Sequence, residues 1–504
     1  MRHSIIIILT LFLVIVSDIS AEEPGKELQQ ESIETTHAIT IDKEKIAYKA
    51  VAGNLILKND QGKAKASVFY IAYNKIEKDP NPSSRPITFC FNGGPGSSSI
   101  WLHVGVLGPK KIILDELGCA VPPYQLIDNQ NSLLAVSDLV FIDPISTGYS
   151  KIAPGEDPKC LHGFDEDVKW MSEFIRLYIV KANRWSSPKF IAGESYGTTR
   201  AVGLIDYLYD QNHIAFNGII LISPVLNFLT IKEGNGNDLP YILSLPSFTA
   251  AAWHHEKLSK ELQNQSLAQL LQEVEEFAFL EYSNALLHGD NLNEQDSKSV
   301  IQQLADYTGL SSEYITKSKM RVDTMRFAKE LLRDERRTIG RFDSRVEGME
   351  GDLGYCSIEV DPSLDTIASG FNAALNDYLH RELKYVKEEE YKVLTNLSPW
   401  NYGTQAANQY LNVSGKLTDA ILRNPHLRVF VGCGYYDLAT PYFASNYTFD
   451  HLGLDATLKT HIFRHYYEAG HLMYTHEPSL IKLNQDLSTF ILSTCPAQET
   501  KLKK

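Results

Sequence analysis

The stretch Gly193-Glu194-Ser195-Tyr196-Gly197 decides how this chain is interpreted. It follows the apolar residues 189–192, which predict a buried strand, and it precedes residues 198–208, where apolar positions recur at helical spacing. A sharp turn from strand to helix is the setting of a nucleophile elbow, and glycines flank it because side chains would collide there. Ser195 is therefore the candidate nucleophile. A chain with 31 glycines produces such a match by accident often enough that other residues must support it.

A serine hydroxyl is a weak nucleophile unless a histidine accepts its proton and a carboxylate orients that histidine. In chains with this kind of elbow, the acid and then the histidine follow the serine, each after a strand. Asp437 follows the strand-like residues 428–432, and His471 follows a strand ending at Tyr466. Taken alone, an aspartate after a strand is often only a helix cap. Taken alone, His471 is one of 15 histidines, most of which are expected at the surface or hydrogen-bonded in the core. Their joint order predicts a catalytic triad.

A second glycine-rich loop, Asn92-Gly93-Gly94-Pro95-Gly96, follows the apolar residues 87–91. Its backbone can approach a substrate closely, so it is a candidate for half of an oxyanion hole. We predict that the N–H of Gly94, with Gly93 as the fallback, and the N–H of Tyr196 donate to the oxyanion. The loop lacks the lysine of a phosphate-binding loop and the spacing of a dinucleotide fingerprint.

The rest of the chain predicts an α/β fold around these loops. Short alternating runs before residue 75 predict antiparallel strands, and later strand-like runs alternate with helical segments. Near-continuous apolar strands predict a largely parallel central sheet with helices on both faces, as in an α/β-hydrolase. Residues 257–287 predict one long helix with an apolar stripe that runs from Leu267 to Leu280, and we expect a mostly helical insertion to cap the active site.

The 504 residues carry a net charge of −14 and no basic run, which argues against nucleic acid or anionic lipid as a partner. Arg2 and His3 precede the apolar residues 5–16, which predicts a signal peptide, with a retained membrane anchor as the alternative. After cleavage we expect no stable membrane association. The expected segments are a signal peptide (1–21), a flexible polar arm (22–36), the first part of the α/β core (37–235), the helical cap (236–398), the second part of the core (399–495) and a polar tail (496–504).

No metal or organic cofactor is expected, because the triad supplies its own base. The six cysteines show no metal-ligand spacing, and the sequence leaves their pairing open between disulfides and buried thiols. It also leaves the oligomeric state open.

At this point the chain resembles the serine carboxypeptidase family over roughly residues 37–492. The resemblance is carried, in family order, by Asn92-Gly93-Gly94-Pro95-Gly96-Ser97-Ser98-Ser99, Ile142-Asp143-Pro144 with Gly148-Tyr149-Ser150, the elbow, Gly434-Tyr435-Tyr436-Asp437 and Gly470-His471. Residues 101–105 and 439–442 look most like the family's bacterial branch, which implies a periplasmic or extracellular enzyme. The resemblance implies hydrolysis of C-terminal residues from peptides or proteins through an acyl-enzyme.

The resemblance also implies that Asn92, Gly93 and Glu194 hold the terminal carboxylate of the substrate. Glu194 can donate a hydrogen bond to that carboxylate only when protonated, which implies a preference for acid pH. Better-known eukaryotic members carry a second glutamate where this chain has Val106-Leu107. We hypothesise that Glu194 and Asn92 suffice without it.

Two other functions remain open at this stage. An esterase or acyltransferase would use the same fold and triad, because an acyl-enzyme can pass its acyl group to acceptors other than water. A non-catalytic binding protein on a hydrolase scaffold is disfavoured, because Ser195, Asp437, His471 and the glycine loop are all present.

Overall fold

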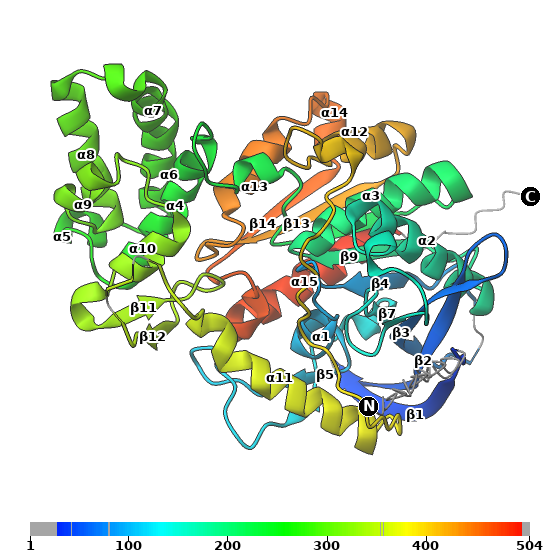
Figure 1. Cartoon of the computed structure of the whole chain (residues 1–504). Helices are drawn as coiled ribbons and strands as arrows, with labels where there is room; N and C mark the ends of the chain where they lie inside the picture. Colours follow the sequence, from blue (N-terminus) through cyan, green and yellow to red (C-terminus); the bar gives the residue numbers. More distant parts are fainter. Residues whose placement is uncertain (1–27, 42, 79–80, 353, 356, 496–504) are drawn as a thin grey trace, which may run out of the picture.

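The computed structural model describes residues 28–495, except 42, 79–80, 353 and 356 (Figure 1). The expected signal peptide and the polar tail lie outside the described residues. None of the helices in the described part of the chain is long and apolar enough to cross a membrane.

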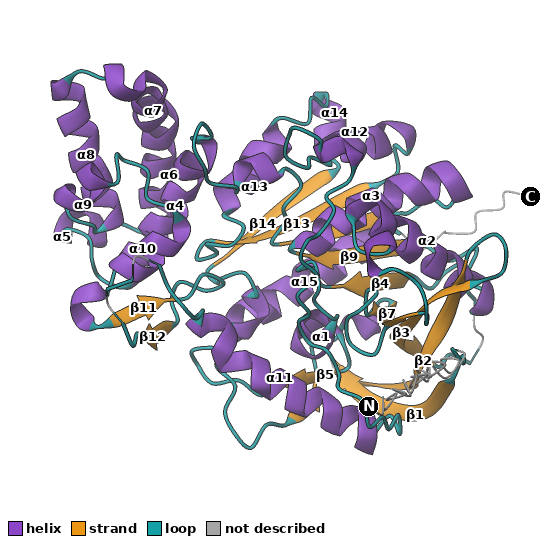
Figure 2. Cartoon of the chain, viewed as in Figure 1, coloured by secondary structure: helices purple, strands orange, loops and turns teal. Residues whose placement is uncertain are grey.

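A ten-stranded mixed sheet forms the centre of the molecule (Figures 1 and 2). Its order is β1-β2-β3-β7-β4-β9-β10-β13-β14, with the short β8 paired to β3. The strands from β7 to β14 in this order are parallel. The first strands are antiparallel: β1 pairs with β2, β2 with β3, and β3 with β7. The bounds are β1 Ser32–Ile41, β2 Glu44–Lys58, β3 Ala64–Lys75, β4 Ile87–Phe91, β7 Asp138–Ile142, β8 Lys151–Ile152, β9 Lys189–Glu194, β10 Gly218–Ile222, β13 Arg428–Gly434 and β14 Ile462–Tyr467. The predicted, largely parallel sheet is confirmed.

The central strands are apolar throughout because both faces of the sheet are covered. Ile219 and Leu221 of β10 belong to one hydrophobic cluster, whereas Ile220 and Ile222 belong to another on the opposite face. Three helices cover the first face: α2 Phe164–Lys181, α3 Tyr196–Asn212 and α12 Ser414–Arg423. The second face is covered by α1 Ile100–Leu102, α11 Pro362–Arg381 and α15 Glu477–Thr494.

Helices between β10 and α11 form a group to one side of the sheet (Figure 1). They are α4 Leu239–His254, α5 Lys260–Gln263, α6 Leu267–Phe277, α7 Ser283–His288, α8 Glu294–Thr308, α9 Ser312–Lys317 and α10 Thr324–Glu330. A hairpin of β11 Arg337–Ile339 and β12 Glu347–Met349 leads from them back towards the sheet. Beyond β13, α13 Tyr442–Asp450 and α14 Ala456–Lys459 precede β14, and the remaining hairpin pairs β5 Lys110–Ile112 with β6 Leu126–Asp128.

The expectation of one continuous helix over residues 257–287 is wrong. The segment is divided into α5, α6 and α7, and a π-helical turn, Ala278–Tyr282, joins the last two. The wider turn changes which side chains face the core, so Leu280, expected in the apolar stripe, is 65% exposed.

The flexible arm expected at residues 22–36 ends earlier than predicted. β1 begins at Ser32, five residues before the expected start at residue 37, because β2 is long enough to pair with it from Gly53 onwards. The Asn54 side chain also holds the residues just before β1, since its Oδ1 accepts from Glu31 N at 2.7 Å and its Nδ2 donates to Gln29 O at 2.9 Å.

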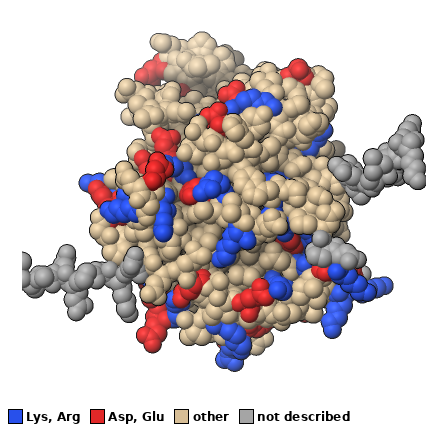
Figure 3. Space-filling model, turned by 90° about the vertical axis from the view of Figure 1, so that its right-hand side faces the viewer, with Lys and Arg blue, Asp and Glu red and all other residues tan. Residues whose placement is uncertain are grey.

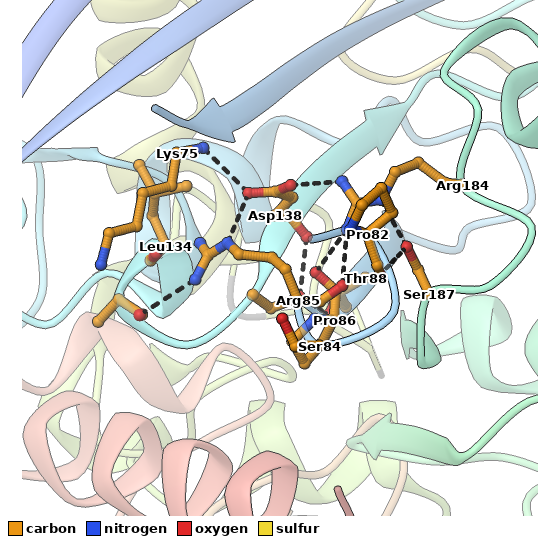
Figure 4. Close-up of polar contacts among 12 residues, drawn as sticks. Lys75, Pro82, Ser84, Arg85, Pro86, Thr88, Leu134, Asp138, Arg184 and Ser187 are labelled. Atoms are coloured by element: carbon orange, nitrogen blue, oxygen red, sulfur yellow. Dashed lines mark hydrogen bonds and ion pairs between the residues drawn. The ribbon is translucent and has the colours of Figure 1, made fainter. Parts of the chain in front are cut away.

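A buried charge cluster closes the amino ends of the parallel strands (Figure 4). Asp138, the first residue of β7, accepts at Oδ1 from Lys75 N at 3.0 Å and from Arg85 Nε at 2.9 Å, and at Oδ2 from Arg184 Nη1. Arg184 Nε also donates to Ser187 Oγ at 2.6 Å. Both oxygens of this buried carboxylate therefore have charged partners.

The face shown in Figure 3 carries mixed charge: acidic and basic side chains lie interspersed on it, with no large patch of one sign. The described cysteines, Cys90, Cys119, Cys160, Cys433 and Cys495, are free thiols.

Candidate active site

Ser195 lies at the turn between β9 and α3, with φ 60° and ψ −131°. A non-glycine residue in this region is strained, and the surrounding packing holds it there. A Cβ added to Gly193 would lie 2.2 Å from Gly197 O, and one added to Gly197 would lie 2.9 Å from Phe91 O. The flanking glycines are therefore required by close backbone approach, as the sequence predicted.

The structure brings Ser195, Asp437 and His471 together at the carboxyl ends of β9, β13 and β14. Ser195 and His471 line the same cavity, and His471 Nδ1 lies 2.7 Å from Asp437 Oδ2. The histidine is 2% exposed and the aspartate is fully buried. This contact leaves the other ring nitrogen, Nε2, available to accept a proton.

Thr440 completes the surroundings of Asp437, a role that was not predicted from the sequence. Its hydroxyl donates to Asp437 Oδ2 at 2.7 Å, while the N–H groups of Ala439 and Thr440 donate to Oδ1 at 2.7 and 2.9 Å. Burial alone would raise the pKa of Asp437, but His471 and Thr440 stabilise the carboxylate and leave the pKa below its usual value. The aspartate is thus held ionised beside the histidine.

The glycine loop lies against the elbow. A Cβ on Gly93 would lie only 2.5 Å from Tyr196 N, so no other residue fits there. Among the described residues, neither Gly94 N nor Tyr196 N donates to a protein acceptor. Gly94 and Tyr196 also line the cavity beside Ser195, as predicted donors must.

Arg200 is a further residue of the site that motif reasoning missed. It is 1% exposed, donates from Nη1 to Asn92 O at 2.6 Å and from Nε to Asp167 Oδ2 at 2.7 Å. Its position one turn after the elbow was the available signal. The guanidinium fastens the glycine loop to α3 and thereby fixes the distance between the two loops.

Asn92 and Glu194 form a buried pair next to the triad. Asn92 Nδ2 donates to Glu194 Oε1 at 2.8 Å, and Leu102 N donates to Asn92 Oδ1 at 3.0 Å. Burial raises the pKa of Glu194 to about 7, against the opposing effects of His471, Tyr474 and Asn92. The carboxyl is therefore protonated in mildly acid solution.

One oxygen of this carboxyl is unsatisfied. Glu194 Oε2 and the hydroxyl of Tyr474 are both buried, and neither has a well-formed hydrogen bond to a described residue. The Tyr474 hydroxyl is nevertheless close enough to favour the ionised form of Glu194. Tyr474 was not predicted, and its place three residues after His471 was the only signal.

The cavity at these residues has a volume of about 290 Å³. One flank is formed by residues of the first hydrophobic cluster, and the opposite flank by residues of the second. The first flank consists of Val225, Phe228, Ile231 and Tyr402, and the second of Trp101, Phe342, Leu364 and Leu472. A strained serine, a histidine–aspartate pair and free N–H donors around one cavity are the parts needed for acyl transfer.

Comparison with known proteins was consistent with this geometry. A family model described as serine carboxypeptidase matches residues 42–477. Serine carboxypeptidase-like 20 of Arabidopsis thaliana is 30% identical over 171 residues, which cover 32% of this chain and 31% of that protein. Serine carboxypeptidase S10 family member 1 of Dictyostelium discoideum is 27% identical over 183 residues, or 35% and 38% of the two chains. The chain thus aligns with about a third of the length of these relatives.

The fold is shared with a solved structure. The prohormone-processing carboxypeptidase Kex1 of Saccharomyces cerevisiae superposes with a TM-score of 0.53 at 15% identity, over 88% of this chain and 91% of that one. This likeness concerns the fold, and it confirms the α/β-hydrolase class predicted from the sequence.

Proposed function

The chain belongs to the serine carboxypeptidase family, and on that premise we propose that it removes single residues from the C-termini of peptides. Ser195 is the proposed nucleophile, His471 the general base and Asp437 the carboxylate that orients it. The observation that carries the proposal is the contact of His471 with Asp437 on the cavity that Ser195 lines. The strained backbone of Ser195 adds support, because it exposes the hydroxyl at the turn.

In the acylation step, Ser195 Oγ attacks the carbonyl carbon of the last peptide bond while His471 Nε2 takes the hydroxyl proton. The carbonyl oxygen becomes an oxyanion, which the N–H groups of Gly94 and Tyr196 stabilise. The C–N bond then breaks, and the leaving amine receives the proton from Nε2. The products are an ester on Ser195 and a free amino acid.

In the deacylation step, water attacks the ester carbonyl and gives a proton to His471 Nε2. The C–O bond to Ser195 breaks, and the serine oxygen recovers that proton. Asp437 stays ionised throughout, because its hydrogen bonds and the histidine favour the carboxylate.

Recognition of the substrate's C-terminus is assigned to Asn92, Gly93 and Glu194. A protonated Glu194 donates to the substrate carboxylate, whereas an ionised Glu194 repels it. The pKa of about 7 is what supports this role without a second carboxyl in the same site. Binding of free C-termini should therefore weaken as the pH rises through 7.

The experiment is to incubate the protein with a peptide and follow the products by mass spectrometry. A ladder shortened one residue at a time from the C-terminus supports the proposal. Cleavage of esters without a ladder, or transfer to an added acceptor alone, would identify the enzyme as an esterase or acyltransferase. At pH 5 a peptide amide should react more slowly than the free acid, since equal rates would remove the proposed role of Glu194.

Two proposals concern the chain outside this chemistry. We propose that residues 1–21 direct export and are removed, which N-terminal sequencing of the exported protein tests. We also propose that the insertion expected at residues 236–398 caps the core, except for α11, which packs on the second face of the sheet. Limited proteolysis tests this proposal through cuts confined to the other helices of that segment.

A further inference from the structure

Two cationic side chains line the active-site cavity and form no ion pair with a described residue. They are Arg341 and Lys232, and among the described residues neither uses its side-chain nitrogens in a hydrogen bond or ion pair. The protein has a net charge of −14, and on the face shown in Figure 3 acidic and basic groups are mixed. Two cations without an ion pair on one cavity of an acidic chain indicate a negatively charged ligand group.

Neither of the carboxylates close to Arg341 in the sequence, Asp343 and Asp361, forms an ion pair with its guanidinium. Asp343 is already paired with Arg345, whose Nε and Nη2 lie 3.0 and 2.7 Å from its two oxygens. Asp361 Oδ1 accepts from the backbone N–H of Arg341 at 3.2 Å, while the guanidinium makes no ion pair with it. The two arginines of this loop therefore differ: the Arg345 guanidinium is paired with a carboxylate of the protein, whereas Arg341 lines the cavity.

The position of Arg341 is fixed by the loop that carries it. Residues 340–346 join β11 to β12 and are fastened to the loops of the proposed triad. These contacts are His471 N to Phe342 O at 2.5 Å, Leu438 N to Arg341 O at 3.0 Å, Ser344 N to Tyr436 O at 3.0 Å and Gly470 N to Asp343 Oδ2 at 3.1 Å. A Cβ on Gly470 would lie 2.3 Å from Phe342 O, so this contact requires a glycine before the histidine.

The side chains place Arg341 on the flank that receives the leaving residue. Its guanidinium carbon lies 4.4 Å from the centre of the Phe342 ring, and that ring lies 4.9 Å from the imidazole of His471. His471 must protonate the leaving amine, so the terminal residue occupies the flank next to it. Trp101 and Leu472 on this flank suit the aliphatic part of a side chain.

We propose that Arg341 is a specificity-determining residue that binds the carboxylate side chain of a C-terminal aspartate or glutamate. The inference rests on the proposed carboxypeptidase function. The α-carboxylate already has Asn92, Gly93 and Glu194, which leaves the guanidinium for a second carboxylate. A planar guanidinium suits this purpose because it donates two parallel hydrogen bonds to one carboxylate.

The test compares two blocked dipeptides that differ only in a C-terminal Glu or Gln, which have nearly the same shape. The wild-type protein should prefer Glu in kcat/KM by about ten- to a hundredfold, the range of a charge-assisted hydrogen bond. In Arg341→Gln the ratio should fall to about one while the Gln peptide reacts as before, and Arg341→Lys should give an intermediate ratio. Using a ratio within each variant removes the effect of any loss of folded protein.

Lys232→Gln is the matched control, because it removes the other cation that lines the cavity, next in sequence to Ile231 of the first flank, and should leave most of the preference. Equal loss on both peptides in Arg341→Gln would mean that Arg341 serves the α-carboxylate, and would overturn the inference. So would a wild-type ratio near one, with the carboxypeptidase function still standing. Hydrolysis of neither peptide would overturn that function and the inference with it.

Discussion

At the amino ends of β4 and β7 the Asp138 carboxylate has partners at both oxygens, two of them arginines (Figure 4). At the carboxyl end of β9, the Glu194 carboxyl has one hydrogen bond, from Asn92, and its other oxygen is buried without a well-formed one. Both groups are buried in the same sheet. The fully paired carboxylate contributes to the fold, whereas the half-paired one is left with hydrogen-bonding capacity for a ligand.

The largest effect should come from removing the nucleophile at the carboxyl end. We expect Ser195→Ala to lower kcat by at least about 10⁴-fold, because no other group can form the acyl-enzyme. The midpoint of thermal unfolding should change little, since the Ser195 side chain supports no part of the core. Peptide ladders and calorimetry measure the two effects. Substantial activity in the variant would show that the nucleophile lies elsewhere.

At the opposite end, Asp138→Ala should act on stability alone. It leaves Arg85 and Arg184 buried without their counter-charge, which costs about 3–5 kcal/mol in the free energy of unfolding. Urea denaturation measures the loss, and kcat/KM per correctly folded molecule should be unchanged.

Asp377→Ala is the matched control for this change, because Asp377 pairs with Arg381 on an exposed helix face. It should cost no more than about 0.5 kcal/mol. If both variants lose the same amount, the contrast between buried and exposed pairs does not hold in this protein.

The pH dependence of kcat/KM tests the role of the half-paired carboxyl of Glu194. Its pKa of about 7 means that the protonated, donating form is present below pH 7 and is lost as the pH rises through that value. For free-acid peptides, kcat/KM should therefore fall by about tenfold per pH unit above 7. Glu194→Gln should flatten this limb, because an amide donates at every pH. The corresponding peptide amides serve as the control, and an identical limb with them would contradict the assignment.

The smallest effect concerns Tyr474. Its hydroxyl lowers the pKa of Glu194, so Tyr474→Phe should move the alkaline limb of kcat/KM to higher pH. Tyr378→Phe removes another buried phenol from the same hydrophobic cluster, outside the cavity, and should leave the limb in place. A limb that moves in both variants, or in neither, would exclude a specific influence of Tyr474 on Glu194.

Much of the fold was predictable because its signals are local. Apolar runs predicted the parallel strands, and the glycines at 193 and 197 predicted a turn that admits no side chain. The wrong predictions concern features that depend on contacts between distant segments or on a local change of helix geometry. The early start of β1 depends on pairing with β2, and the exposure of Leu280 depends on a single π-helical turn.

The candidate active site also contains residues that could be predicted from the sequence and residues that could not. The order of Ser195, Asp437 and His471 is visible in the chain because each follows a strand, and this order predicted the triad. The family was indicated only when the glycine loop at Asn92 and the other ordered motifs were added. Arg200 and Thr440 were not predicted in their roles, since each acts through atoms brought close only by folding.

Residue types and their spacing are enough to predict the nucleophile elbow, the order of the proposed triad and membership of the serine carboxypeptidase family. Which charged groups have a partner depends on the folded chain. Asp138 and Glu194 are both acidic residues at strand ends, and Arg341 and Arg345 lie in one loop. What separates the members of each pair is whether the folded chain supplies a charged partner: Asp138 has Arg85 and Arg184, and Arg345 has Asp343, whereas Glu194 and Arg341 form no ion pair with a described residue. The electrostatic energy of such a group depends on the distance to its partner and on burial.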